Sequence, residues 1–330
     1  MTIEAAQNEA LTKPDLAQAA LPKKRERVWE IDFLRGAAIL GMVIDHFLYD
    51  LSALQNYFYN FYDVASPQLI EFSAQMALYY ASPVRQFFHS LAILFFLMSG
   101  ISCSFSRNNF RHAGKILLFA GLITLFTYSL FYITSGLLGP ASAIDIRILF
   151  GVLFVLGIGV LLVAIIQLLP GAKWIELGLG SAILLFGILY GFLGPNKLDI
   201  VDWKSFWQKI FYIFDVAPYQ GLLRLNEAPN FFAKVTGFEA PDFFASMFGF
   251  IRTGSDYFPM LPWIGFTLIG AFLGQTLYKE KKSLLPKIDP MWHRPVDWFG
   301  ANSLYIYVLH QPFWLLVLLL IFLPMGFRMF

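Results

Sequence analysis

Charge and cysteine are scarce in this chain. Asp, Glu, Lys and Arg make up 14% of its 330 residues, and 24 basic against 22 acidic side chains leave a net charge of +2. So small a balance gives no electrostatic footprint for nucleic acid, and we expect none as a partner. The single cysteine, Cys103, lies in an apolar stretch, which excludes a disulfide framework and a thiolate metal site. We expect no metal in the function of the chain.

Apolar residues take the place of the missing charge. Hydrophobic residues make up 58% and aromatic residues 18% of the chain, more than a soluble domain of this size needs. A window of about 20 residues finds stretches long enough to cross a bilayer. They lie at about 31–51, 85–106, 114–135, 147–169, 174–194, 258–278 and 299–324. The sequence therefore predicts an all-α fold, a polytopic bundle of about seven transmembrane helices in a lipid bilayer.

The ends of these stretches predict an orientation. Residues 1–28 are polar and partly basic, without the apolar core and cleavage site of a secretory signal, and we expect them to form a disordered cytoplasmic tail. Residues 29–330 then form one transmembrane domain. If the spans alternate, the basic residues of the short loops fall on the side of the tail. These are Arg107, Arg111, Lys115, Lys173, Lys279, Lys281, Lys282, Lys287 and Arg294. The positive-inside rule therefore predicts a multi-pass protein with its N-terminus in the cytoplasm.

The first span carries ionisable residues that an apolar helix does not need. Arg35, His46 and Asp50 all fall within 31–51. At about 100° per residue, His46 returns to the helix face of Arg35 within roughly 20°, about 16 Å further along. Ionisable groups at membrane depth normally face a protein interior or a water-filled cavity, so this face marks a functional site. The small residues at 36–41 between them would let another helix or a slender ligand come close.

His46 is the candidate catalytic residue. A histidine can take a proton from an attacking hydroxyl or amine near neutral pH, or act as a nucleophile itself. Asp50, one turn on, is placed to orient the ring. The alternative is that His46 caps the outer end of the span in headgroup water. Arg35 is a candidate ligand for the phosphates of a nucleotide-containing donor, or else a boundary residue paired with Asp32 or Glu30.

Hydrogen-bonding residues are frequent in the last span, where Asn302, Ser303, Tyr305 and His310 lie close together. So many polar groups in one span predict the wall of a cavity that contacts the substrate. Asn302, Ser303 or Tyr305 could stabilise the oxyanion of an acyl transfer at His46. For His310 the alternative is a histidine satisfied by a neighbouring helix.

Three arginines outside the first span are further candidates. Arg107 and Arg111 lie in a short loop on the predicted cytoplasmic side, where they are candidate contacts of the donor. Arg147 opens the fourth span and is a candidate contact of the substrate.

Five blocks of the sequence resemble, in family order, the bacterial relatives of the heparan-alpha-glucosaminide N-acetyltransferase catalytic domain. They are EIDFLRGAAILGMVIDHFLYDL, FFLMSGISCSFSR, FGVLFVLGIGVLL, YFPMLPWIGFTLIGAFLG and GANSLYIYVLHQP, and they extend from Glu30 to about Pro312. The first block also resembles the signature of a wider superfamily of membrane acyltransferases that modify cell-surface glycans, an arginine and a histidine separated by ten residues.

The resemblance implies an acetyltransferase of the bacterial inner membrane. In such proteins acetyl-CoA binds from the cytoplasm, and the acetyl group passes to a sugar hydroxyl or amine on the far side. Arg35 and His46 match the signature, as a contact of the donor and as the base or transient acetyl acceptor. His310 matches the histidine of the terminal block. The lysosomal eukaryotic enzyme has its catalytic histidine in the loop after the first span, and residues 56–83 here hold none. The expected acceptor is therefore an unspecified glycan, glycolipid or other small molecule.

Two other classes of protein remain open. A transporter or exporter of a small anionic or glycolipid solute would use Arg35, His46 and His310 as a substrate and proton pathway. Transporters often show similarly interrupted helices in their two halves, and the sequence shows no such pairing. A non-enzymatic membrane subunit would use its polar spans to bind partner helices. Large apolar helices also make a homodimer possible.

Overall fold

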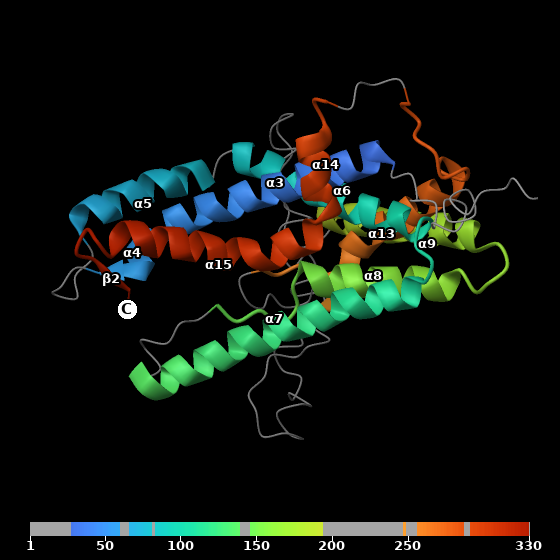
Figure 1. Cartoon of the computed structure of the whole chain (residues 1–330). Coiled ribbons are helices and arrows are strands. Elements are labelled where there is room, and N and C mark those ends of the chain that lie inside the picture. Colours follow the sequence, from blue (N-terminus) through green and yellow to red (C-terminus); the bar gives the residue numbers. More distant parts are fainter. Residues whose placement is uncertain are drawn as a thin grey trace, which may run out of the picture.

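The computed structural model describes residues 28–59, 66–80, 83–138, 146–193, 247–248, 256–286 and 291–329. These residues are almost entirely helical (Figure 1). The helices are α3 (Trp29–Ser52), α4 (Leu54–Tyr57), α5 (Pro67–Tyr80), α6 (Pro83–Cys103), α7 (Asn109–Leu138), α8 (Val152–Ile166), α9 (Ala172–Leu193), α13 (Met260–Thr276), α14 (Arg294–Ala301) and α15 (Ser303–Phe322). Two short strands, β1 (Phe58–Tyr59) and β2 (Arg328–Met329), pair antiparallel. The all-α class is thus confirmed, while residues 1–27 of the predicted tail 1–28 lie outside the described residues.

Each predicted span overlaps most of one of seven helices, α3, α6, α7, α8, α9, α13 and α15. Three segments are long and apolar enough to cross a membrane: Asn109–Leu137, Ala172–Leu189 and Ser303–Phe322. The apolar parts of α6, α8 and α13 are shorter, and α3 is long enough but carries several charges. The described helices thus fit a membrane bundle, and the number of crossings stays a prediction.

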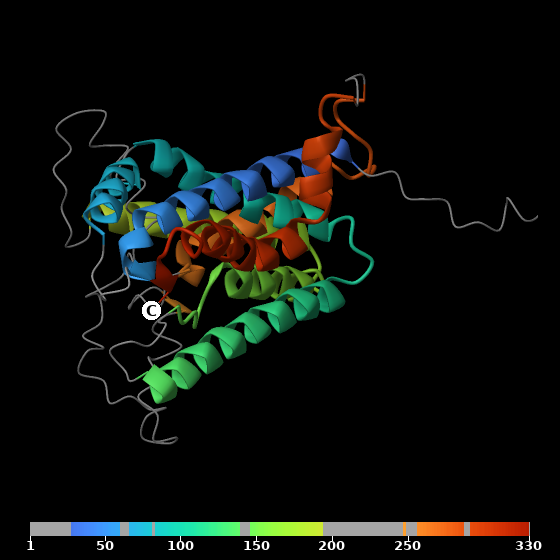
Figure 2. The same cartoon turned by 60° about the vertical axis from the view of Figure 1, so that its left-hand side comes forward.

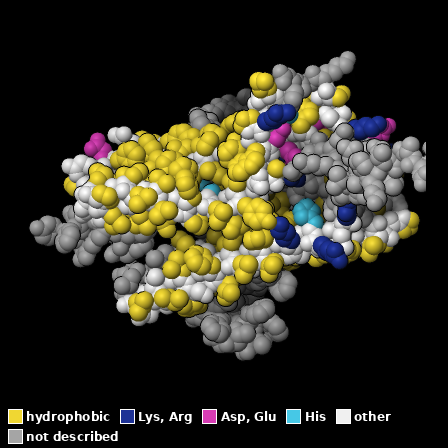
Figure 3. Space-filling model, viewed as in Figure 1, with side chains coloured by type: hydrophobic (Ala, Val, Ile, Leu, Met, Phe, Trp, Pro, Cys, Tyr) yellow, Lys and Arg dark blue, Asp and Glu magenta, His cyan; other side chains and the backbone are white. Residues whose placement is uncertain are grey.

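Among the helices of the predicted spans, two pairs of neighbours run in opposite directions. The end of α8 meets the start of α7 through Gln167 and Asn109. The end of α13 meets the start of α9 through Gln275 and Glu176. The start of α3 lies beside the end of α6, where Arg35 donates a hydrogen bond to Ser102. At the same end of the bundle, Lys115 near the start of α7 donates to Tyr305 near the start of α15 at 3.1 Å. We call this the basic end, because Lys and Arg side chains gather there in Figure 3, whereas the long side of the molecule is mostly hydrophobic.

The bundle is layered, with α3 and α7 at opposite edges and α8 next to α7 (Figures 1 and 2). Ten of the fifteen residues of α8 are buried, and Trp263 of α13 and Phe96 of α6 are fully buried beside it. α3 and α15 lie side by side and run the same way. Phe47 stacks on Trp314 with ring centroids 4.1 Å apart, and Phe58 stacks on Phe322 at 4.7 Å. Polar residues of the first and last spans can therefore meet.

Candidate active site

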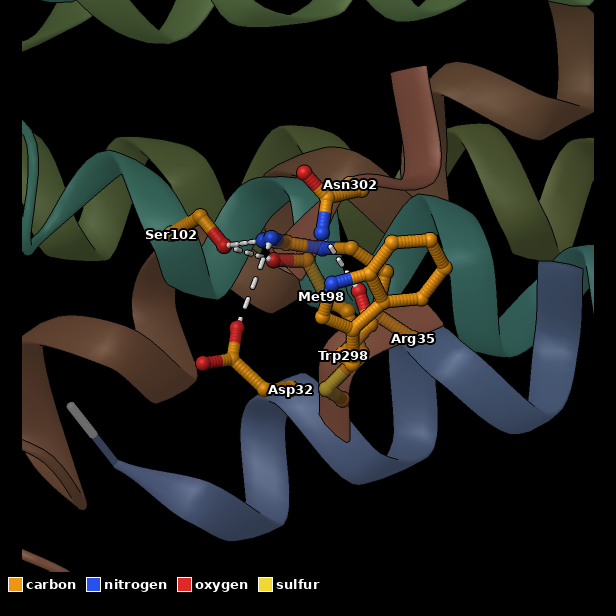
Figure 4. Close-up of polar contacts among 6 residues, drawn as sticks. All are labelled: Asp32, Arg35, Met98, Ser102, Trp298 and Asn302. Carbon is orange, nitrogen blue, oxygen red and sulfur yellow. Dashed lines mark hydrogen bonds and ion pairs between the residues drawn. The ribbon is translucent and has the colours of Figure 1, made fainter. Parts of the chain in front are cut away.

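Arg35 is anchored at the basic end between α3 and α6 (Figure 4). Its guanidinium donates to the hydroxyl of Ser102 and lies 3.9 Å from the carboxylate of Asp32, one turn earlier on α3. Ser102 in turn donates to the backbone carbonyl of Met98 at 2.5 Å. Glu30, the other partner considered for Arg35, accepts hydrogen bonds from the hydroxyl of Ser283 and from the backbone N–H of Leu284. Arg35 thus has a fixed position, with 19% of its side chain exposed.

A cavity of about 480 Å³ opens beside Arg35, a volume in the range of small-molecule sites. Polar side chains in its lining lie on or next to α3, α6, α7 and α15: Asp32, Arg35, Ser99, Ser102, Ser106, His112, Lys115, Asn302, Ser303 and Tyr305. Apolar side chains in its lining include Phe95, Ile116, Leu153, Leu156 and Leu304. We call this space the Arg35 cavity. Its two cations, Arg35 and Lys115, suit phosphate groups, and its apolar lining suits an apolar or slender chain.

Two glycines let α14 cross α3 closely enough to shape this cavity. A Cβ at Gly300 would lie 1.7 Å from the carbonyl oxygen of Asp32, and a Cβ at Gly36 would lie 2.0 Å from that of Val296. The chain then turns at Asn302, whose side-chain amide donates to the carbonyl of Trp298 at 2.8 Å (Figure 4). The last span is therefore broken at Asn302, where the sequence predicted a continuous helix from residue 299.

This break decides where the polar residues of the last span lie. Asn302, Ser303 and Tyr305 line the Arg35 cavity. Ser303 is about 10 Å along α15 from His310, so these residues lie at the basic end rather than beside His46. The oxyanion role expected for them at His46 does not fit this placement.

The small residues between Arg35 and His46 admit other helices. Gly36 faces α14, and a Cβ at Gly41 would lie 2.3 Å from the side chain of Leu91 on α6. Of the two readings that the sequence left open, the structure favours close helix packing here.

His46 and His310 form a hydrogen-bonded pair between α3 and α15. Nδ1 of His46 lies 2.6 Å from Nε2 of His310, and the two rings stack with centroids 4.9 Å apart. His310 is buried, and its Nδ1 lies 2.5 Å from the backbone carbonyl of Tyr307. His46 is partly exposed. The sequence singled out both histidines but did not pair them, since their pairing depends on α3 and α15 lying side by side.

The other predicted residues lie in varied surroundings. Asp50 is buried on α3, one turn beyond His46. Arg107 lines a second cavity, of about 720 Å³, at the basic end. Arg111 is exposed on the first turn of α7, where its backbone N–H donates to Asn108 at 2.9 Å. The guanidinium of Arg147 lies 3.9 Å from the ring centroid of Phe131. The structure therefore groups neither Arg111 nor Arg147 with the described lining of the Arg35 cavity.

Several residues of the Arg35 cavity were missed as candidates by the sequence analysis, Ser102, His112 and Lys115 among them. These three come from the end of α6 and the start of α7. Lys115 appeared there only as a basic loop residue, and a single serine gives no signal of its own. Among the described residues, no group of three or more His, Cys, Asp or Glu is arranged to hold a metal ion.

Three helices of membrane length, together with ionisable groups inside the bundle, indicate a helical membrane protein with an interior polar site. The chain belongs to the family described as heparan-alpha-glucosaminide N-acetyltransferase, catalytic, which matches residues 27–221 and 229–312. The resemblance drawn from the five sequence blocks is thus confirmed. Membership of this family indicates a membrane acetyltransferase. Neither a curated protein nor a solved structure matches the chain.

Proposed function

We propose that the protein transfers an acetyl group from cytoplasmic acetyl-CoA to a glycan, glycolipid or other small acceptor on the extracytoplasmic side of the membrane. One observation carries the proposal. The same two helices, α3 and α15, bring a basic cavity together at one end and a histidine pair further along. A donor that is anionic at one end and reactive at the other fits this arrangement.

The Arg35 cavity would bind the donor. The guanidinium of Arg35 and the ammonium of Lys115 would contact phosphate oxygens. Arg107, in the neighbouring cavity, is a second candidate for the nucleotide part. The pantetheine arm would follow the apolar part of the cavity lining. It must cover about 16 Å, the rise of α3 from Arg35 to His46.

His46 would act where the donor meets the acceptor. As a base it takes the proton of the acceptor's hydroxyl or amine while that oxygen or nitrogen bonds to the thioester carbon. The carbon–sulfur bond breaks, and the CoA thiolate leaves and receives the proton from His46. As a transient acetyl acceptor, the ring would instead carry the acetyl group between two such steps. Asp50 would support the positive ring in either case.

The orientation follows from the charges. The basic end, where α3 starts, lies in the cytoplasm in this proposal, as the positive-inside rule requires. The protein then resides in the inner membrane of a bacterium. His46 lies toward the outer leaflet, where an extracytoplasmic acceptor can reach it.

The test measures donor binding and turnover separately. We would compare the purified protein in nanodiscs with His46→Ala and Arg35→Ala, using calorimetry for acetyl-CoA binding and thioester hydrolysis or CoA exchange for turnover. His46→Ala should lose turnover by about 100-fold or more and still bind acetyl-CoA. Arg35→Ala should weaken binding by about 10- to 100-fold.

Lys173→Ala is the matched control for charge at the basic end. Lys173 lies 5.3 Å from the ring centroid of Trp174, and this variant should behave like the wild type. Absence of acetyl-CoA binding in every version would contradict the proposal and favour transport of another solute.

A further inference from the structure

The hydrogen bond between His46 and His310 has a direction that the backbone determines. Two neutral imidazoles can share such a bond only if one ring nitrogen donates and the other accepts. Nδ1 of His310 lies 2.5 Å from the backbone carbonyl of Tyr307, one turn earlier on α15. A carbonyl oxygen only accepts, so Nδ1 of His310 carries its hydrogen.

The position of the hydrogen on His310 determines the position of the hydrogen on His46. A neutral His310 with hydrogen on Nδ1 has a lone pair on Nε2, the atom 2.6 Å from His46. That lone pair accepts the hydrogen on Nδ1 of His46. A neutral His46 then has its own lone pair on Nε2, which is the atom that can take a proton or attack a thioester.

From these two hydrogen bonds we infer that His310 is a positioning residue. It holds His46 in the tautomer and ring orientation that make Nε2 of His46 the reacting atom. The inference rests on the proposed acetyl transfer and deepens it, because it gives a different role to a residue considered for substrate contact. When Nε2 of His46 takes a proton, the ring becomes positive and its Nδ1–H bond to His310 strengthens. A neutral imidazole here does what the third member of a hydrolase triad does.

Burial and anchoring support this division of roles. His310 is 7% exposed, whereas His46 is partly exposed and can meet a substrate. The position of Tyr307, which supplies the carbonyl, is fixed by its hydroxyl, which donates to the carboxylate of Asp256 just before α13. The acceptor for His310 is therefore tied both to α15 and to the segment that leads into α13.

Two substitutions of His310 separate its two ring nitrogens. In His310→Gln the side-chain carbonyl reaches roughly the place of Nε2 and can accept from His46. In His310→Asn the shorter amide reaches only the place of Nδ1, so it can donate to the Tyr307 carbonyl but not accept from His46. Both variants keep a polar group in the buried position, which limits loss of folding.

The experiment is ¹⁵N NMR of histidine-labelled protein in bilayers, with the signals of His46 identified from their loss in His46→Gln. In the wild type and in His310→Gln, Nδ1 of His46 should be protonated and Nε2 not. In His310→Asn the two tautomers should mix. Acetyl transfer should fall less than about 10-fold in His310→Gln and about 100-fold or more in His310→Asn, with KM for acetyl-CoA unchanged in both.

Three results would overturn the inference. A wild-type His46 protonated on Nε2 would contradict the direction of the bond. An unchanged His46 tautomer in His310→Asn would show that His310 does not set it. Loss of transfer in His310→Gln despite the correct tautomer would make His310 a reacting group. If the wild type transfers no acetyl group, the proposed function fails, and the NMR spectra still decide whether His310 positions His46.

Discussion

Lys115 is the residue that most extends the predicted donor site. It lines the Arg35 cavity, donates to Tyr305 at 3.1 Å, and supplies a second positive charge from a different helix. If it contacts a phosphate of CoA, Lys115→Ala should weaken acetyl-CoA binding by about 10-fold or more and leave kcat nearly unchanged. Calorimetry and steady-state kinetics in nanodiscs measure the two quantities.

The donor itself offers the control for this prediction. S-acetyl-pantetheine lacks the nucleotide and its phosphates, so its turnover should be equally poor in the wild type and in Lys115→Ala. An effect of the same size on both donors would mean that Lys115 acts through the shape of the cavity and not through a phosphate contact.

The residues of the first span could be predicted because one helix contains them all. The spacing of Arg35 and His46 fixes their common face by the periodicity of the α-helix alone. Their partners come from α6 and α15. The periodicity of one helix does not determine which other helices pack against it. Ser102 and His310 could therefore be assigned to Arg35 and His46 only from the structure.

At the scale of elements, the crossing of α14 over α3 holds the donor site together. A Cβ at Gly300 would meet backbone, the carbonyl oxygen of Asp32, which cannot move aside as a side chain can. Gly300→Ala should therefore destabilise the fold by about 1–3 kcal/mol and also weaken acetyl-CoA binding, since both helices line the cavity. Thermal unfolding in detergent and calorimetry provide the two measurements.

Gly121→Ala on α7 is the matched substitution. No described atom outside its own helix neighbourhood lies within 4 Å of a Cβ at Gly121, so the variant should be as stable as the wild type or slightly more stable. Equal unfolding temperatures for Gly121→Ala and Gly300→Ala would show that the crossing tolerates a wider separation.

The helices of the predicted spans could be predicted from the length of the apolar stretches. The points at which a helix is interrupted could not. The stretch from residue 299 to 324 is apolar enough to suggest one span, yet the chain turns at Asn302 and starts α15 anew at Ser303. Gly300 permits the close crossing that places this turn, and only the neighbouring helix reveals why a glycine is needed there. α5 lies outside the predicted spans, so apolar length did not predict this helix either.

At the scale of the whole molecule, the alternating helix directions and the basic end together predict one membrane topology. If the seven helices of the predicted spans all cross the membrane, the N-terminal residues and the basic end lie in the cytoplasm and the end of α15 lies outside. An even number of crossings would place both ends of the chain on one side. Whether α15 crosses the membrane, and whether the basic end faces the cytoplasm as the proposed direction of acetyl transfer requires, can be tested together.

Two introduced cysteines test this topology. Lys282 at the basic end has a side chain 74% exposed, and Met325 just beyond α15 is 64% exposed. In intact cells a membrane-impermeant maleimide should label Met325→Cys and not Lys282→Cys, and in inverted membrane vesicles the pattern should reverse. The native Cys103 is 3% exposed, so the wild type should stay nearly unlabelled. Labelling of both cysteines from the same side would exclude an odd number of crossings between residues 282 and 325. It would also contradict the proposal that the donor cavity faces the cytoplasm.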